Sequence, residues 1–145
     1  MPRKFLVPLD LTSEDPPEIR FAADLARAVG AEVVLLHVID YVPTLLPVEL
    51  PGGYPLPQLD IVRDAASQKL ARIGAKLGAV PVRAIVEMGG AAAQSVEAAR
   101  REKADQIIIG SHSHKAIARL VLGSVADRVA HTAGCPVTIV REMKA

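Results

Sequence analysis

The hydrophobic positions alternate between short, nearly continuous apolar runs and longer segments in which apolar residues recur every three or four positions. The runs occupy residues 5–9, 32–38, 82–88, 106–110 and 136–141. Such runs are typical of strands that are buried on both faces, as in a parallel sheet. The pattern therefore predicts an α/β fold, with an open five-stranded parallel sheet, helices on both faces and right-handed crossovers.

The segments between the runs predict four helices, each with one apolar face. Those faces are Phe21, Ala22, Leu25, Ala28 and Val29; Leu59, Val62, Ala66, Leu70, Ile73 and Leu77; Ala92, Val96 and Ala99; and Leu122, Val125 and Val129. Asp15, Pro16 and Glu18 form a capping-box pattern at the start of the first helix. Gly30 and Gly78 stand where glycine commonly ends a helix, after the first and second helices.

The composition of the chain argues against some classes of binding partner. The chain has 145 residues, a size typical of one domain, with a net charge of +1 and 3% aromatic residues. A chain with so little net charge and so few aromatic side chains offers neither the electrostatic field nor the stacking platforms of nucleic-acid-binding and membrane-binding proteins. No apolar run reaches the length of a membrane span. We therefore expect one cytoplasmic domain, residues 1–145, with a small-molecule partner.

Cysteine usage agrees with a reducing compartment. Cys135 is the single cysteine, which excludes an intramolecular disulfide and a cysteine-rich zinc site. Its neighbours predict a small apolar residue in the core.

Residues 41–58 interrupt the alternation of strands and helices. This segment carries five prolines and the pair Gly52-Gly53, together with large apolar side chains that include Leu45, Leu46, Val48, Leu50, Tyr54 and Leu56. The proline content predicts a loop, and the apolar content is too high for a freely solvated linker. A loop packed over its own domain, a flap over a ligand and an arm that contacts a partner remain alternatives.

Candidate ligand residues follow the strands, because an open parallel sheet binds ligands beyond the carboxyl ends of its strands. Neither the dinucleotide motif G-x-G-x-x-G nor the Walker loop follows the first strand. After the fourth strand, by contrast, Gly110, Ser111 and Ser113 lead toward Gly123-Ser124, which open a helix. A strand-end glycine, small hydroxyls and a helix N-terminus together favour an anion site, although an ordinary strand-to-helix connection uses the same residues.

The sequence gives less support for a metal site or a catalytic site. His112 and His114 point the same way in an extended segment, but no third ligand with suitable spacing accompanies them. His37 and His131 are typical of structural histidines. Asp10 follows the first strand and is the candidate for a general base or a Mg²⁺ ligand, without a second carboxylate tied to it by sequence.

The chain resembles the universal stress protein family along its whole length. The opening "FLVPLD", the segment "VVLLHVID" and the closing "LGSVADRVAHTAGCPVTIVR" carry the resemblance. The family's nucleotide-binding pattern, G-x2-G-x9-G-[ST], is matched in spacing by Gly110, position 113 and Gly123-Ser124. The resemblance implies a Rossmann-like sheet of order 3-2-1-4-5 and a homodimer joined along the fifth strand, residues 136–141. In one branch of the family it also implies ATP, with or without Mg²⁺, as a regulatory ligand.

Carried over position by position, the resemblance implies two groups of ligand contacts. Pro8, Leu9, Asp10 and Val38 would meet the adenine and ribose, and Gly110, Ser113, Gly123, Ser124 and Val125 would surround the phosphates. Ser113 departs from the family's glycine. A left-handed residue other than glycine costs about 1–2 kcal/mol, which corresponds to about a five- to thirtyfold loss of affinity.

Three functions follow as hypotheses. The first is a stress-response regulator that binds ATP as a ligand. The second is a member of the nucleotide-free branch that acts through dimerisation and partner contacts. The third is a slow ATPase that uses Asp10 and a divalent ion.

Overall fold

The sheet has the predicted architecture. The computed structural model describes residues 3–40, 56–111 and 122–142. Within them, five strands pair in the order β3-β2-β1-β4-β5, and every pair is parallel. The strands are β1 (Arg3–Pro8), β2 (Ala31–Ile39), β3 (Val82–Met88), β4 (Gln106–Gly110) and β5 (Val137–Val140). Both the fold class and the strand order expected from the resemblance are confirmed.

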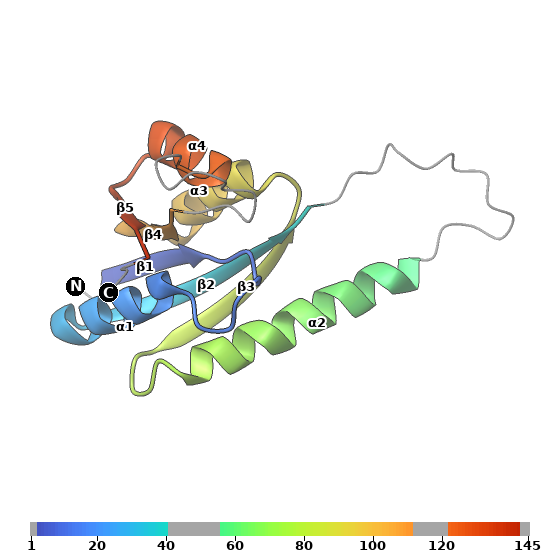
Figure 1. Cartoon of the computed structure of the whole chain (residues 1–145), viewed down its shortest axis with the longest axis horizontal. Coiled ribbons are helices and arrows are strands. Elements are labelled where there is room, and N and C mark those ends of the chain that lie inside the picture. Colours follow the sequence, from blue (N-terminus) through green and yellow to red (C-terminus); the bar gives the residue numbers. More distant parts are fainter. Residues whose placement is uncertain (1–2, 41–55, 112–121, 143–145) are drawn as a thin grey trace, which may run out of the picture.

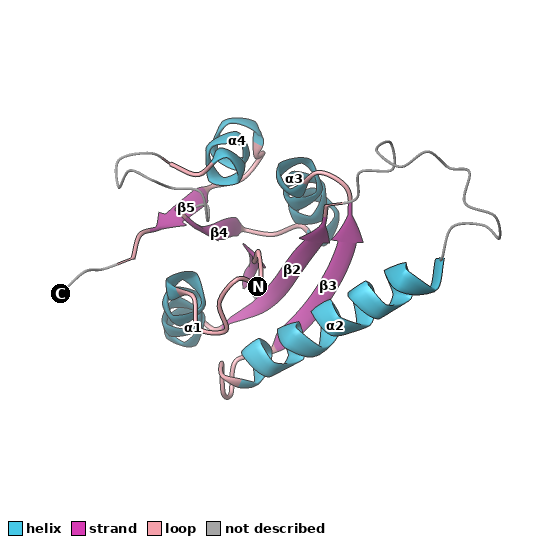
Figure 2. Ribbon diagram, turned by 45° about the vertical axis from the view of Figure 1, so that its right-hand side comes forward, coloured by secondary structure: helices cyan, strands magenta, loops and turns pink. Residues whose placement is uncertain are grey.

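Helices cover both faces of the sheet. Helices α1 (Pro17–Val29) and α2 (Leu56–Ala75) lie on one face, whereas α3 (Ala91–Glu102) and α4 (Ser124–Thr132) lie on the other (Figures 1 and 2). Successive residues of the central strands alternate between the two layers. Leu35 belongs to the apolar cluster under α1 and α2, and Leu36 belongs to the cluster under α3 and α4. Both leucines are fully buried, as expected for a strand covered on two sides.

The buried face of α1 differs from the predicted one. Phe21 is 41% exposed and Val29 is 39% exposed, so neither lies in the core. The helix instead buries Ile19 and the alanines at positions 22, 23 and 26. Small alanines let the helix approach the sheet closely, and this contact leaves the larger side chains at the edge.

Only one of the predicted helix-end signals of α1 is confirmed. Gly30 has a left-handed φ of 74° and donates its N–H to the carbonyl oxygen of Ala26. The capping box is wrong: the N-cap is Pro16, and no side chain caps the helix. Asp15 instead pairs with Arg20 at 3.1 Å.

Helix α2 begins and ends earlier than the sequence predicts. It starts at Leu56, so the last residues of the predicted 41–58 loop are helical, and residues 41–55 lie outside the described part. It ends at Ala75, and Gly78, with a left-handed φ of 67°, belongs to the turn that follows. Among the described residues, no helix combines the length and the apolar content that a membrane span requires.

Ion pairs lie at the end of the sheet where the strands begin. Lys4 pairs with Glu32 at 3.2 Å and with Glu102 at 3.8 Å, and Arg83 also binds Glu102. The hydrogen bond from Arg83 holds the pKa of the Glu102 carboxyl below its usual value. These charged side chains therefore lie at the amino ends of the strands, at the other end of the sheet from the carboxyl ends.

Cys135 packs against the apolar layer under α3 and α4. Burial raises the pKa of its thiol. The partly buried side chain agrees with the predicted role of a small apolar residue beside the core.

Candidate functional site

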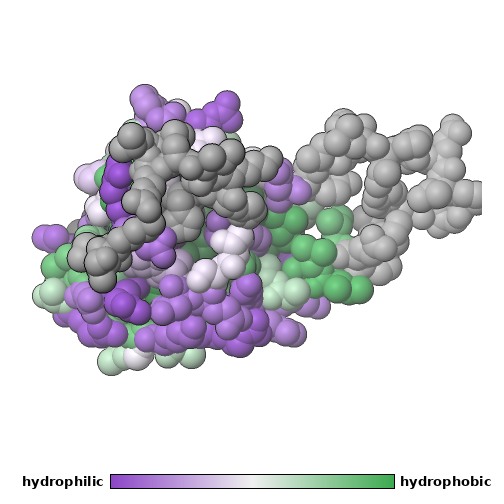
Figure 3. Space-filling model, in the orientation of Figure 1, coloured by the Kyte–Doolittle hydropathy of each residue, from purple (hydrophilic) through white to green (hydrophobic). Residues whose placement is uncertain are grey.

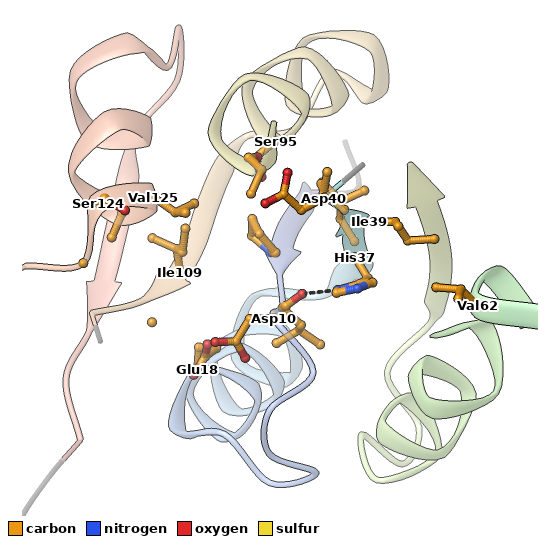
Figure 4. A pocket seen from close by; sticks show the side chains of 18 residues that line it. Asp10, Glu18, His37, Ile39, Asp40, Val62, Ser95, Ile109, Ser124 and Val125 are labelled. Carbon is orange, nitrogen blue, oxygen red and sulfur yellow. Dashed lines mark hydrogen bonds between the residues drawn. The ribbon is translucent and has the colours of Figure 1, made fainter. Parts of the chain in front are cut away.

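A pocket of about 620 Å³ opens at the carboxyl ends of the central strands (Figure 4). Its volume is in the usual range for small-molecule sites. It lies where β1 and β4 are adjacent but lead to helices on opposite faces, which is the switch point of the sheet. The lining comprises Pro8, Leu9, Asp10, Glu18, Leu36, His37, Val38, Ile39, Asp40, Val62, Ala91, Ser95, Ile109, Gly110, Gly123, Ser124, Val125 and Ala126.

Asp10 is held at the pocket by a tight turn after β1. Its Oδ1 accepts hydrogen bonds from the backbone N–H of Thr12 at 3.1 Å and from the Thr12 hydroxyl at 2.8 Å. Leu11, between them, has a left-handed φ of 63°. That conformation costs about 1–2 kcal/mol for a leucine, so surrounding contacts must stabilise it. The Lys69 ammonium supplies one by donating to the Leu11 carbonyl oxygen at 2.5 Å.

The N-terminus of α4 forms another wall. The N–H of Gly123 donates to the Ser111 carbonyl oxygen at 2.8 Å, and the N–H of Ser111 donates to Val140 at 3.0 Å. These bonds fix the start of α4 beside the ends of β4 and β5. Ser124 and Val125 line the pocket, and they are the first two residues of α4, so their backbone belongs to its first turn. The N–H groups of a first turn have no partner inside the helix and attract anions.

Glu18 reaches the pocket from the first turn of α1. Its side chain is 8% exposed, and its carboxylate lies against the backbone of Gly110. A β-carbon at position 110 would stand 2.5 Å from Oε2 of Glu18 and 2.9 Å from Oε1. Only glycine therefore fits at this strand end while the carboxylate holds its place.

His37 and Ser95 are polar residues of the wall with defined partners. The Nδ1 of His37 lies 2.8 Å from the Leu9 carbonyl oxygen (Figure 4, dashed line). A carbonyl oxygen can only accept, so Nδ1 carries the proton and Nε2 is the ring acceptor when the imidazole is neutral. The Ser95 hydroxyl donates to the Ala91 carbonyl oxygen at 2.7 Å. The histidine thus has a satisfied structural contact, as the sequence predicts, and also faces the pocket.

Most of the predicted ligand residues lie together in this pocket. They are Pro8, Leu9, Asp10, Val38, Gly110, Gly123, Ser124 and Val125. Ser111 lies beside the pocket through its bond to Gly123 and is absent from the lining. Ser113, with its neighbours His112 and His114, lies outside the described residues. Among the described residues, those of the pocket included, His, Cys, Asp and Glu side chains form no cluster of three that could hold a metal.

The sequence missed two polar residues of the pocket, Glu18 and Ser95. Asp40, by contrast, directly follows the second apolar run, and this strand-end position made it a candidate. Glu18 had a competing explanation as part of a capping box. Ser95 lies inside a helix, where no strand-end argument applies. A pattern along the chain cannot show that the start of α1 packs against the end of β4.

Relatives of the chain are well defined. The universal stress protein family matches residues 1–141. Universal stress protein MJ0531 of Methanocaldococcus jannaschii is 30% identical over 98% of this chain and 84% of its own length.

Solved structures agree with the sequence match. The structure of hypothetical protein MJ0577 is similar with a TM-score of 0.81 and 25% identity, covering 100% of this chain and 99% of the other. The universal stress protein from Archaeoglobus fulgidus in complex with dAMP is similar with a TM-score of 0.62 and 26% identity, covering 94% and 96%. The chain belongs to the universal stress protein family.

Proposed function

We propose that this protein binds an adenine nucleotide in the pocket at the strand ends, and that the nucleotide acts as a regulatory ligand. The observation that carries the proposal is the convergence of Asp10, Val38, Gly110 and the start of α4 on one hollow at the switch point of the sheet. A parallel sheet brings its strand ends together, and here they leave a pocket of about 620 Å³, the size of a small-molecule site.

The residues that line the pocket can contact the base, the ribose and the phosphate of a nucleotide. Leu9, Val38 and Ile109 give apolar surface for a base. The exposed carboxylate of Asp10 can accept hydrogen bonds from ribose hydroxyls or from an amino group of the base. The first turn of α4 offers backbone N–H groups to a phosphate. The structure of the Archaeoglobus fulgidus relative with dAMP supports the proposal by similarity.

The protein as purified, without added nucleotide, is expected to contain an adenine nucleotide or to bind one with a Kd below the millimolar range. Mass spectrometry of the denatured protein would identify a retained ligand. Calorimetric titration with adenosine, AMP, ADP and ATP would then give the affinities. The absence of heat or retained ligand with all four compounds, up to millimolar concentrations, would remove the proposal and favour a role through partner contacts alone.

We also propose a homodimer joined along residues 136–141. Strand β5 is an edge strand whose outer side has no neighbour among the described strands. Its four residues are all half-buried in the monomer, and an unpaired edge is a template for a second chain.

An Ile139→Pro substitution is expected to shift the protein from dimer to monomer. The backbone of Pro136 and Val140 faces β4, so that of Ile139 faces the open edge, and proline removes the N–H that would pair with a second chain. Light scattering after size-exclusion chromatography would measure the mass of each protein. A Thr132→Lys substitution on the exposed end of α4 is the control and should leave the mass unchanged. A wild-type protein of monomer mass would contradict this proposal.

A further inference from the structure

The carboxylate of Asp10 has one oxygen that is already bonded within the protein. Its Oδ1 accepts two hydrogen bonds from Thr12, one from the backbone N–H and one from the hydroxyl. No described residue donates to Oδ2, so this oxygen can accept a hydrogen bond from a ligand in the pocket that Asp10 lines. The direction of Oδ2 is therefore set by the turn that brings Thr12 back to Asp10.

The chain that leads into Asp10 is fixed by strand β2. The N–H of Leu9 donates to the Leu36 carbonyl oxygen at 2.8 Å. The carbonyl oxygen of Leu9 accepts a hydrogen bond from Nδ1 of His37, also at 2.8 Å. The backbone before Asp10 is thus held on the sheet by both polar groups of Leu9.

The chain that follows Asp10 depends on a different support. Leu11 has a left-handed φ of 63°, which costs free energy for a residue with a β-carbon. Its side chain packs against the apolar layer under α1 and α2, and its carbonyl oxygen accepts a hydrogen bond from the Lys69 ammonium. A hydrogen bond from a charged donor is stronger than one between neutral groups. Lys69 therefore stabilises the strained residue that lies between Asp10 and Thr12.

Helix α2 contacts this loop at two points through lysine side chains. Lys69 bonds Leu11, the neighbour of Asp10, and within the described part of the chain it forms no ion pair. Lys76 donates to the carbonyl oxygen of Glu14 at 2.6 Å. The two lysines make contacts of the same kind, but Glu14 lies farther from Asp10 along the chain. Lys69 is therefore the one whose contact adjoins the pocket residue.

We propose that Lys69 is a positioning residue of the nucleotide site, which holds Leu11 in the conformation that orients Asp10 and thereby couples the affinity of the pocket to helix α2. The inference rests on the proposed function and adds a residue that is absent from the described lining of the pocket. Coupling between two sites is reciprocal, so a nucleotide bound to Asp10 also stabilises the bond between Lys69 and Leu11.

The test combines variants of Lys69 and Asp10 in a double-mutant cycle. Lys69→Met keeps the length of the side chain and removes its charge and its donors. Asp10→Asn keeps an oxygen that can accept from Thr12 and replaces the other oxygen by an amide nitrogen. Lys76→Met is the matched control, because Lys76 makes the same kind of bond to the backbone of Glu14. Wild type, the three single variants and the double variant are titrated calorimetrically with AMP and with ATP.

Lys69→Met is expected to weaken the binding of AMP and of ATP about tenfold, because both carry the nucleoside that Asp10 is proposed to contact. In the Asp10→Asn background the same substitution should change both affinities by less than about twofold, since Lys69 acts through Asp10. Lys76→Met should match wild type within about twofold, although it removes a bond of the same kind. A lysine with a merely structural role would weaken binding equally in both backgrounds.

A second measurement uses wild type alone, so it serves even if Lys69→Met folds poorly. An amine-reactive reagent acylates exposed lysines, and mass spectrometry gives the initial rate at each position. Saturating AMP or ATP should slow the labelling of Lys69 at least about threefold, because the nucleotide stabilises the bond that shields its ammonium. The rate at Lys76 should stay within about twofold of its value without nucleotide.

The outcomes separate the inference from the function on which it rests. Nucleotide affinity that is unchanged in Lys69→Met, or that falls equally in both Asp10 backgrounds, would overturn the positioning role and leave the nucleotide site. An equal loss in Lys76→Met, or a labelling rate at Lys69 that nucleotide does not change, would overturn it too. No binding of AMP or ATP to wild type would remove the proposed function and the inference together.

Discussion

A Gly110→Ala substitution is expected to weaken adenine-nucleotide binding at least tenfold and to lower the free energy of unfolding by about 1–3 kcal/mol, although it adds one methyl group. The new β-carbon would stand 2.5 Å from Oε2 and 2.9 Å from the carboxyl carbon of Glu18. The Glu18 carboxylate has to move away from this contact, and the open space beside it is the pocket that it lines. The movement brings the carboxylate into the space where the phosphate is proposed to lie.

Glu18 also supplies the test of this explanation. In a Glu18→Ala background the same methyl group meets no carboxylate, so Gly110→Ala should cost about 1–2 kcal/mol less than in wild type. Urea denaturation of the four proteins of this cycle measures the coupling. Gly134→Ala is the matched control, because its β-carbon meets no atom within 4 Å, and it should change stability by less than about 0.5 kcal/mol. Equal costs of Gly110→Ala in both backgrounds would show that the contact with Glu18 is not the cause.

Some residues of the pocket could be predicted from the sequence, and others could not. Asp10, Val38 and Gly110 stand directly after or near the end of apolar runs, and parallel strands bring such positions to one edge of the sheet. The central strands β1, β2 and β4 were predictable because their apolar runs are buried on both faces, whereas the edge strands β3 and β5 are only partly buried. Glu18 was not predictable, since a carboxylate in a first helical turn is explained equally well by the helix itself. Its contact with Gly110 depends on how α1 packs against the sheet.

The sequence also predicts only in part which face of a helix is buried. The apolar spacing of α1 predicts burial of Phe21, whereas the helix rests on its alanines and leaves Phe21 at the edge. Periodicity identifies a helix and the width of its apolar face. The rotation of that face depends on the size of the side chains beneath it, which only the packed structure fixes.

Leu70→Ala is expected to be strongly destabilising, by about 2–5 kcal/mol, whereas Ile61→Ala on the same helix should change the free energy of unfolding by less than about 0.5 kcal/mol. The sequence predicts one continuous apolar face on α2, including Val62 and Leu70. Leu70 and Ile73 are fully buried on the inner side of α2, but Val62 is 47% exposed and Ile61 is 66% exposed. The first turns of α2 run past the sheet (Figure 1), and apolar residues gather on the surface at that end (Figure 3).

The contrast arises because a leucine truncated in a packed layer leaves a cavity, while an exposed isoleucine leaves none. Alanine also has the higher helix propensity, which offsets any small loss at position 61. Urea denaturation of both variants, with equal m-values, measures the difference. A cost above about 1 kcal/mol for Ile61→Ala would mean that the start of α2 is covered in solution, by a second copy of the chain or by a ligand. Repeating the measurement on wild type and Ile61→Ala at tenfold lower protein concentration separates these cases. A dimer through β5 affects both proteins equally, so only a second copy on α2 makes the difference between them depend on concentration.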